Sequence, residues 1–287
     1  MSVAQILVPV TGSMRDGVAL ATAFEAARPF NAHVKVLFVH ADPREAIPYS
    51  DMPLSSEIAQ QLVDTADTLA KAAAKSARTT LAKVAGEAGV KIVADPRRAA
   101  SVTVSYKEVV GHLPACVAEE ARLCDLVVFP ALAKGDTAIH DSFIAALTKT
   151  ERPTLLCAAA GAKHVGRKIA IGWDGGIAAA HALTAALPYL AKAEAIEILS
   201  VRHLASPERG SDEVGAYLGM HGLGCSQRLI EQGQGNVADI LLEAATNSGC
   251  DLLVIGGYGH SRLGETIFGG VTRSIVSHPS VPILMMH

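Results

Sequence analysis

Aromatic residues are scarce in this chain of 287 residues: Phe, Trp and Tyr make up 4% of it, although half of the residues are hydrophobic. Ala, Val, Leu and Ile must therefore supply the core, as is typical of α/β layers. The formal net charge is only −3, and Lys and Arg form no basic stripe, which argues against nucleic acid as a partner. No apolar run approaches the length of about 18 residues that a membrane-spanning helix needs.

Cysteine and histidine patterns exclude two further kinds of site. The five cysteines are odd in number and form no CxxC pair, which predicts reduced, buried thiols in a cytoplasmic protein. The eleven histidines show no His-x3-His spacing, so no metal site is predicted. The N-terminal stretch MSVAQILVPV has no basic segment before its apolar run, and we expect a first strand there instead of a signal peptide.

An internal repeat organises the chain. Each half begins with an apolar run that ends in a turn and is followed by an Ala-rich segment. Later in each half, one apolar run begins at Asp-Leu and another begins at a Pro. The paired segments are AQILVPVTGS (4–13) with RKIAIGWDGG (167–176), HVKVLFVH (33–40) with AIEILSVRH (195–203), CDLVVFP (124–130) with CDLLVIGG (250–257), and RPTLLCA (152–158) with VPILMMH (281–287). Alternating strands and helices predict βαβ units and a parallel sheet in each half.

Two copies of this unit predict two domains, residues 1–159 and 166–287, joined by a small, Gly-containing linker at Ala158–Gly166. The first half has an additional run, Ser56–Glu87, which predicts a long helix capped by Ser55 or Ser56 with Glu57 in its first turn. Unbroken, it would span roughly 48 Å at about 1.5 Å per residue. That exceeds the width of a domain, so we expect a bend or a break. The second half has only a shorter, Gly-interrupted piece at 212–224.

The stretch GGYGHSRLGETIFGGVT, residues 256–272, follows the apolar run at 252–255 and contains six glycines. A loop that leaves a parallel strand and enters a helix presents free backbone N–H groups, and the helix start near Gly269 adds its positive dipole end. Such a place accepts phosphate, and glycine lets the backbone approach an anion closely. No GK[ST] follows, and no GxGxxG lies on the first strand, so neither a P-loop nor a dinucleotide fingerprint is present.

The spacing Gly256-x2-Gly259-x9-Gly269, together with the repeat, resembles the tandem form of the universal stress protein family. The resemblance covers essentially the whole chain and is close over its last 40 residues. It implies two Rossmann-like domains of the adenine nucleotide alpha hydrolase-like class. Each has a five-stranded parallel sheet of order 3-2-1-4-5 with helices on both faces, and ligands bind beyond the carboxyl ends where the order reverses.

The resemblance also implies a site for an adenine nucleotide, ATP, ADP or AMP, in the second domain. Asp174 matches the position that contacts the adenosine, and Val201 the position whose backbone contacts adenine. The residues implied for binding are Gly172, Trp173, Asp174, Val201, Ile255, Gly256, Gly259, Arg262, Gly269, Gly270 and Val271. Glu265 could help to hold Mg²⁺ or could simply be solvated. Asp174 could equally be a turn former or helix cap, and Arg262 a solvated charge.

Two departures from the family pattern bear on affinity. Gly270 stands where the family has Ser or Thr, so a hydroxyl donor to phosphate is lost, worth about 1.5–3 kcal/mol. In the first half, Thr11 occupies the place of Asp174, Gly135 is the only glycine of the loop at 130–147, and Ala145-Ala146 fall near the helix positions where glycines would be needed. We therefore expect the first domain to be degenerate and to bind no nucleotide in the usual way.

The resulting hypothesis is a cytoplasmic, stress-responsive nucleotide switch without evident catalysis, in which any ATP hydrolysis is slow and incidental. The alternative is a nucleotide-free scaffold that keeps the glycine loop as inherited architecture. In that case the apolar last strand, PILMMH (282–287), forms an exposed edge and makes the homodimer contact common in this family. A true ATPase or phosphotransferase is the third and weakest reading. No nucleic acid and no membrane are expected as partners.

Overall fold

The computed structural model describes residues 2–43, 55–133, 135–202, 211–232, 236–257 and 279–287. The elements of the first half are β1 (Gln5–Val10), α1 (Asp16–Ala27), the 3-10 helix η1 (Arg28–Phe30), β2 (His33–His40), α2 (Ser56–Ala88), β3 (Lys91–Ile92), β4 (Thr103–Val110), α3 (Leu113–Ala121), β5 (Leu126–Phe129), α4 (Thr137–Lys149) and β6 (Thr154–Leu156). Those of the second half are β7 (Lys168–Gly172), α5 (Ile177–Leu190), β8 (Ala195–Arg202), α6 (Ser211–Met220), β9 (Ser226–Glu231), α7 (Val237–Asn247), β10 (Leu252–Gly256) and β11 (Ile283–Met286).

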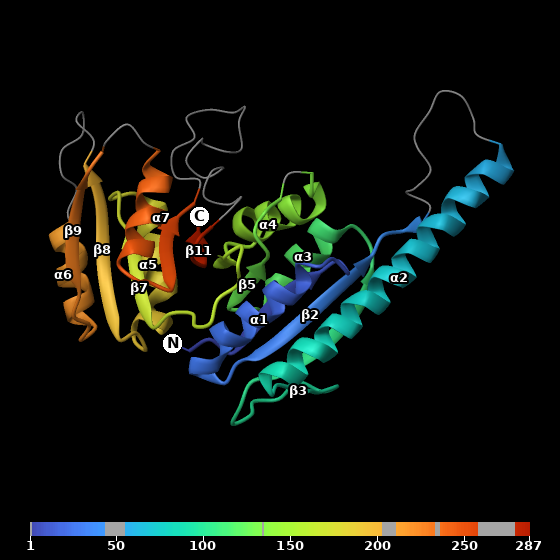
Figure 1. Cartoon of the computed structure of the whole chain (residues 1–287), viewed down its shortest axis with the longest axis horizontal. Helices are drawn as coiled ribbons and strands as arrows, with labels where there is room; N and C mark the ends of the chain where they lie inside the picture. Colours follow the sequence, from blue (N-terminus) through green and yellow to red (C-terminus); the bar gives the residue numbers. More distant parts are fainter. Residues whose placement is uncertain (1, 44–54, 134, 203–210, 233–235, 258–278) are drawn as a thin grey trace.

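The strands of the described residues form one eleven-stranded sheet, in the order β3-β4-β2-β1-β5-β6-β11-β10-β7-β8-β9. In Figure 1, β7, β8 and β9 lie on one side of β11, and β5 and β2 lie on the other. When the strands of each half are numbered along their own repeat, leaving out the two-residue β3, both halves have the order 3-2-1-4-5. The strands within each half pair in parallel. The expected fold class and strand order are therefore confirmed.

The two halves meet where their fifth strands pair. β6 and β11 run antiparallel, with Leu156 opposite Ile283, Leu155 opposite Leu284 and Thr154 opposite Met285. All of these side chains are buried. The last strand thus has β10 on one side and β6 on the other, and the expectation that it forms an exposed edge is wrong. Its unbroken apolar character fits a strand that is covered on both faces.

Helices cover both faces of this shared sheet. Successive side chains of a strand point to opposite faces, so apolar residues at successive positions require a core on each side. On β1, Ile6 and Val8 point into a core that also contains side chains of α1, α2, α5 and α6. Leu7 points to the other face, where the core contains side chains of α3, α4 and α7. Equivalent helices of the two halves therefore lie on the same face, and the two domains share continuous cores.

The long helix α2 is unbroken over 33 residues, so the expected bend or break is wrong. Ser55 caps it by accepting a hydrogen bond from the backbone N–H of Ile58 at 3.3 Å. Its buried residues all lie between Ala74 and Ala85, while its first half reaches past the sheet (Figure 1), so the width of the domain does not limit its length. None of the helices in the described ranges is both long and apolar enough to cross a bilayer.

A polar cluster fastens α2 to the carboxyl ends of β2 and β4. Glu108 accepts from Arg78 Nε on α2 at 2.8 Å and pairs with His40 Nε2 at 3.1 Å. The Arg78 guanidinium lies over the ring of Tyr106, 5.4 Å from its centroid. Burial on its own would raise the pKa of Glu108, but hydrogen bonds from His40, Tyr106 and Arg78 hold it below its usual value of 4.5.

The Glu108 cluster predicts a specific loss of stability in acid. A carboxyl group whose pKa is lowered by folding stabilises the native state above its unfolded pKa, and this contribution disappears as the pH falls through the folded pKa. Glu108→Gln should therefore be less stable than the wild type at pH 7, and the difference should shrink below about pH 4.5. Urea denaturation of both proteins from pH 7 to 3.5 measures this, and a difference that is constant over that range would contradict it.

Candidate functional site

In each half the strand order reverses next to the first strand of the repeat, between β7 and β10 and between β1 and β5. Parallel strands that diverge in this way leave a crevice beyond their carboxyl ends, the usual ligand position in such sheets. The two crevices of this chain are chemically different. The turn after β7 carries an exposed carboxylate, whereas the turn after β1 is closed by a buried one.

In the second domain, β7 ends at Gly172 and a tight turn leads into α5. Asp174 Oδ1 accepts a hydrogen bond from the backbone N–H of Gly176 at 2.8 Å, and Gly175 takes a φ of 72°, which favours glycine. Gly176 is the N-cap of α5 and has no side chain to satisfy the first N–H groups of the helix. The exposed Asp174 carboxylate and the start of α5 therefore lie together at this edge.

The neighbouring strands β8 and β10 bring further predicted residues to the same edge. Val201 is the penultimate residue of β8, and Ile255 and Gly256 end β10. A Cβ on Gly256 would lie 2.5 Å from Ala179 N and 2.6 Å from Ala178 C, so this glycine allows β10 and α5 to approach closely. A Cβ on Gly172 would lie 2.8 Å from Ile255 Cγ2. Both glycines thus have a packing role in the described structure.

Trp173 and Ser200 introduce two buried polar atoms beside this crevice. The backbone N–H of Trp173 donates to Leu199 O at 2.9 Å, which places Trp173 next to Ser200 at the carboxyl ends of β7 and β8. Among the described residues, neither Trp173 Nε1 nor Ser200 Oγ has a hydrogen-bond partner. A buried polar group without a partner is costly, and such groups commonly mark a position for water or ligand. Sequence reasoning included Trp173 but missed Ser200, whose only signal is a small polar residue near a strand end.

The structure brings six of the predicted binding residues to one edge: Gly172, Trp173, Asp174, Val201, Ile255 and Gly256. The remaining five, which are Gly259, Arg262, Gly269, Gly270 and Val271, lie outside the described residues. Glu265 lies outside them as well. In the described part of the chain, no cluster of His, Cys, Asp or Glu could hold a metal ion.

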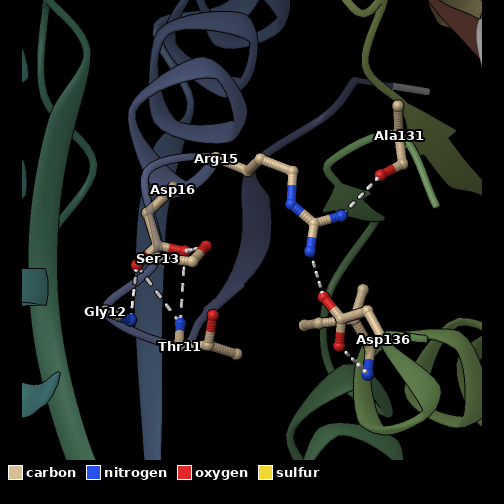
Figure 2. Close-up of polar contacts among 8 residues, drawn as sticks. Thr11, Gly12, Ser13, Arg15, Asp16, Ala131 and Asp136 are labelled. Carbon is tan, nitrogen blue, oxygen red and sulfur yellow. Dashed lines mark hydrogen bonds and ion pairs between the residues drawn. The ribbon is translucent and has the colours of Figure 1, made fainter. Parts of the chain in front are cut away.

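The turn after β1 in the first domain is closed by Asp16, the first residue of α1 (Figure 2). Its carboxylate accepts from the backbone N–H groups of Thr11 at 3.2 Å and Gly12 at 2.7 Å, and from the Ser13 hydroxyl at 3.1 Å. Burial raises the pKa of Asp16, and these donors act in the opposite direction. The N–H groups of this turn are therefore engaged by the chain's own carboxylate.

A second carboxylate, that of Asp136, caps α4 on the other side of the same crevice. Asp136 Oδ1 accepts from the backbone N–H of Ile139 at 3.3 Å. Arg15 forms an ion pair with Asp136 and donates to Ala131 O at 3.1 Å, which ties the turn after β1 to the loop after β5 (Figure 2). The helix start that would attract a phosphate thus already holds an anion with its counter-charge.

The sequence predicts a degenerate first domain, but it did not indicate Arg15, Asp16 or Asp136. An Asp at the start of a helix after a Thr-Gly-Ser turn is a recognisable capping signal, whereas the Arg15–Asp136 pair joins positions 121 apart. The expectation that Ala145 and Ala146 fall near the start of a helix is wrong, because α4 begins at Thr137 and both alanines are buried within it. The glycine of this loop, Gly135, has a φ of 88°.

The cysteines do not contribute to either crevice as disulfides, because all five are free. Cys124, Cys157 and Cys250 are buried as expected, whereas Cys116 and Cys225 are partly exposed. Burial raises the pKa of every one of these thiols, that of Cys157 to about 12, which disfavours the reactive thiolate.

Comparison with known proteins agrees with this architecture. Residues 226–287 match the family model of the Universal stress protein family. The fold is similar to that of a universal stress protein from Archaeoglobus fulgidus DSM 4304, with a TM-score of 0.64 and 12% identity over 98% of this chain and 95% of that one. No curated protein sequence matches the chain.

Two structures from Pseudomonas aeruginosa show the same two-domain fold. A functionally unknown protein from strain PAO1 has a TM-score of 0.57 and 16% identity over 99% of this chain and 92% of that one. A protein from strain UCBPP-PA14, assigned to the universal stress proteins, has a TM-score of 0.53 and 15% identity over 99% and 93%. The family match and the near-complete coverage confirm the resemblance to tandem universal stress proteins that the sequence indicates.

Proposed function

We propose that this two-domain universal stress protein fold binds one adenine nucleotide per chain, in the second domain, at the carboxyl ends of β7, β8 and β10. The observation that carries the proposal is the contrast between the two crevices. In the first domain the buried carboxylate of Asp16 closes the turn after β1 and accepts from the backbone N–H of Gly12. In the second domain the equivalent turn after β7 carries the exposed carboxylate of Asp174, and the N-cap of α5, Gly176, has no side chain. A helix start with its positive dipole end beside an exposed turn favours an anionic ligand.

In this proposal Asp174 orients the adenosine, while the edge of β8 at Val201 supplies backbone contacts to the base. The glycine loop beyond Gly256 supplies N–H groups to the phosphates. Binding acts as a regulatory switch, since a ligand stabilises whichever conformation it prefers. The described residues of this crevice provide no activated nucleophile, and we propose that hydrolysis of a bound ATP is slow and incidental.

Titration with ATP, ADP and AMP, followed by native mass spectrometry and calorimetry, tests the site. We expect one nucleotide per chain and at least a tenfold loss of affinity in Asp174→Ala, because a hydrogen bond to a charged group is worth about 1.5–3 kcal/mol. The matched control is Thr11→Ala, which changes the equivalent position of the first domain and should leave the affinity unchanged. Two nucleotides per chain, or an equal loss in both variants, would contradict the proposal.

The alternative function, a nucleotide-free scaffold, remains a prediction but needs a different contact surface. The strand expected to make the homodimer, β11, is paired on both sides within the chain. The outer strands of the shared sheet are β3 and β9. Of these, β9 has six residues that are mostly exposed, so it is the longer edge on which a partner strand could pair.

A further inference from the structure

A second cavity lies at the opposite edge of the first domain, at the amino ends of its strands. Its volume is about 330 Å³, within the range of small-molecule sites. The cavity is lined by the start of β1, the turn before β2, His33 and the loop before β4. It therefore lies at the edge opposite the carboxyl-end crevices.

The charge of this cavity is not balanced by its own lining. Arg97 and Arg98 line it, and no Asp or Glu does. Arg97 is paired with Asp95, through its Nε at 3.1 Å and its NH2 group at 2.8 Å. Arg98 has no such carboxylate partner within the described ranges. An anion would supply the missing counter-charge, because a guanidinium offers a fixed fork of donors to phosphate or carboxylate.

The floor of the cavity is formed by a buried histidine whose two ring nitrogens both have hydrogen-bond partners. His33 is 8% exposed, and its two ring nitrogens lie 2.9 Å from Thr103 Oγ1 and 2.8 Å from Ser105 Oγ. Burial, together with the charge of Lys35, lowers the pKa of His33, so the ring is neutral at pH 7. Asn31, held at a φ of 52°, places an amide side chain at the rim.

The remaining lining is apolar and includes Val3, Phe30 and Pro96. Phe30 is held in place from the second domain, because its ring packs edge-on against Tyr189 of α5 with centroids 4.9 Å apart. A fixed aromatic wall favours a ligand with a flat or apolar body. The cavity thus combines an apolar wall with Arg98, an arginine that has no ion-pair partner in the described residues; the nearby Asp125 carboxylate accepts from the backbone N–H groups of Ala4 and Gln5.

We propose that this cavity is a binding site for a small organic anion, a phosphate or carboxylate on a short apolar body, with Arg98 as its counter-charge. The proposal does not depend on nucleotide binding in the second domain. Two kinds of anion share this chemistry, and phenyl phosphate and benzoate serve as their probes. Inorganic phosphate is the probe that lacks the apolar body.

Calorimetric titration of the full chain at constant ionic strength, with NMR chemical-shift mapping, tests the proposal. We expect saturable binding of phenyl phosphate or benzoate at one per chain, with shifts at Asn31 and Arg98. Arg98→Gln should weaken binding at least tenfold, in line with the loss of a charge-assisted hydrogen bond. The matched control is Arg122→Gln, an exposed arginine of the same domain that does not line the cavity.

Three results would overturn the assignment. These are the absence of saturable binding by either organic anion, an equal loss in Arg98→Gln and Arg122→Gln, and inorganic phosphate binding as tightly as phenyl phosphate. Titration of Arg98→Gln with AMP separates this site from the proposed nucleotide crevice. Because the two lie at opposite edges of the sheet, the affinity for AMP should not change in this variant.

Discussion

Gly12→Ala is expected to lower the free energy of unfolding by about 4 kcal/mol, because two costs coincide at this position. Gly12 has a φ of 80°, a left-handed conformation that costs an L-residue about 1–2 kcal/mol. A Cβ there would also lie 2.8 Å from the Cα and the carbonyl carbon of Ala73 on α2. These are backbone atoms, so the helix must move, and overpacking of this kind adds about 1–3 kcal/mol or more.

The matched control for Gly12 is Gly89, which ends α2 at a φ of 66° and would place a Cβ in open space. Gly89→Ala should cost only the conformational part, about 1–2 kcal/mol. Urea denaturation of both variants, monitored by circular dichroism, gives the two free energies. If they lose the same stability, the close packing of α2 on the turn after β1 contributes nothing measurable.

Gly256→Ala is expected to destabilise the second domain by about 3 kcal/mol, the upper part of the usual range for overpacking. The added methyl group would meet the backbone of α5 at Ala178 and Ala179. The loss of stability should appear without any nucleotide. It therefore distinguishes a packing role of Gly256 from a role in ligand binding alone. Thermal unfolding of the nucleotide-free protein measures it.

Gly219 in α6 is the matched control, because a Cβ there would have no neighbour within 4 Å. Gly219→Ala should be neutral or stabilise the protein by about 0.5–1 kcal/mol, since alanine loses less conformational freedom in a helix. A Gly256→Ala protein that is as stable as the wild type would mean that β10 and α5 can separate without cost. Gly256 would then have no packing role, and its only role would be in the loop that follows β10.

Much of the fold follows from apolar runs in the sequence, and the parts that do not follow are those with mixed composition. The run HVKVLFVH coincides with β2, and the other repeated runs contain their strands. The third strand of each half, β4 and β9, was not located, because their residues are largely polar or exposed. An edge strand such as β9 needs few buried side chains, so it leaves a weak pattern.

The candidate site likewise contains features that the sequence predicts and features that it does not. The turn at Asp174 and the end of β10 are local features, so a short motif is enough to indicate them. The closure of the first crevice depends on a pair between Arg15 and Asp136, and such a contact appears only when β1 and β5 are placed side by side. Trp173 Nε1 and Ser200 Oγ, which have no partner among the described residues, are likewise buried only by tertiary packing.

The antiparallel pairing of β6 with β11 has a consequence for synthesis of the chain on the ribosome. Thr154 of β6 and Met285 of β11 are 131 positions apart. At a synthesis rate of about 5–20 residues per second, β11 therefore emerges on the order of ten seconds after β6. During that interval the nascent first domain presents Thr154–Leu156 as an open edge. The first domain is thus most vulnerable to wrong pairing between neighbouring nascent chains before its own second half arrives.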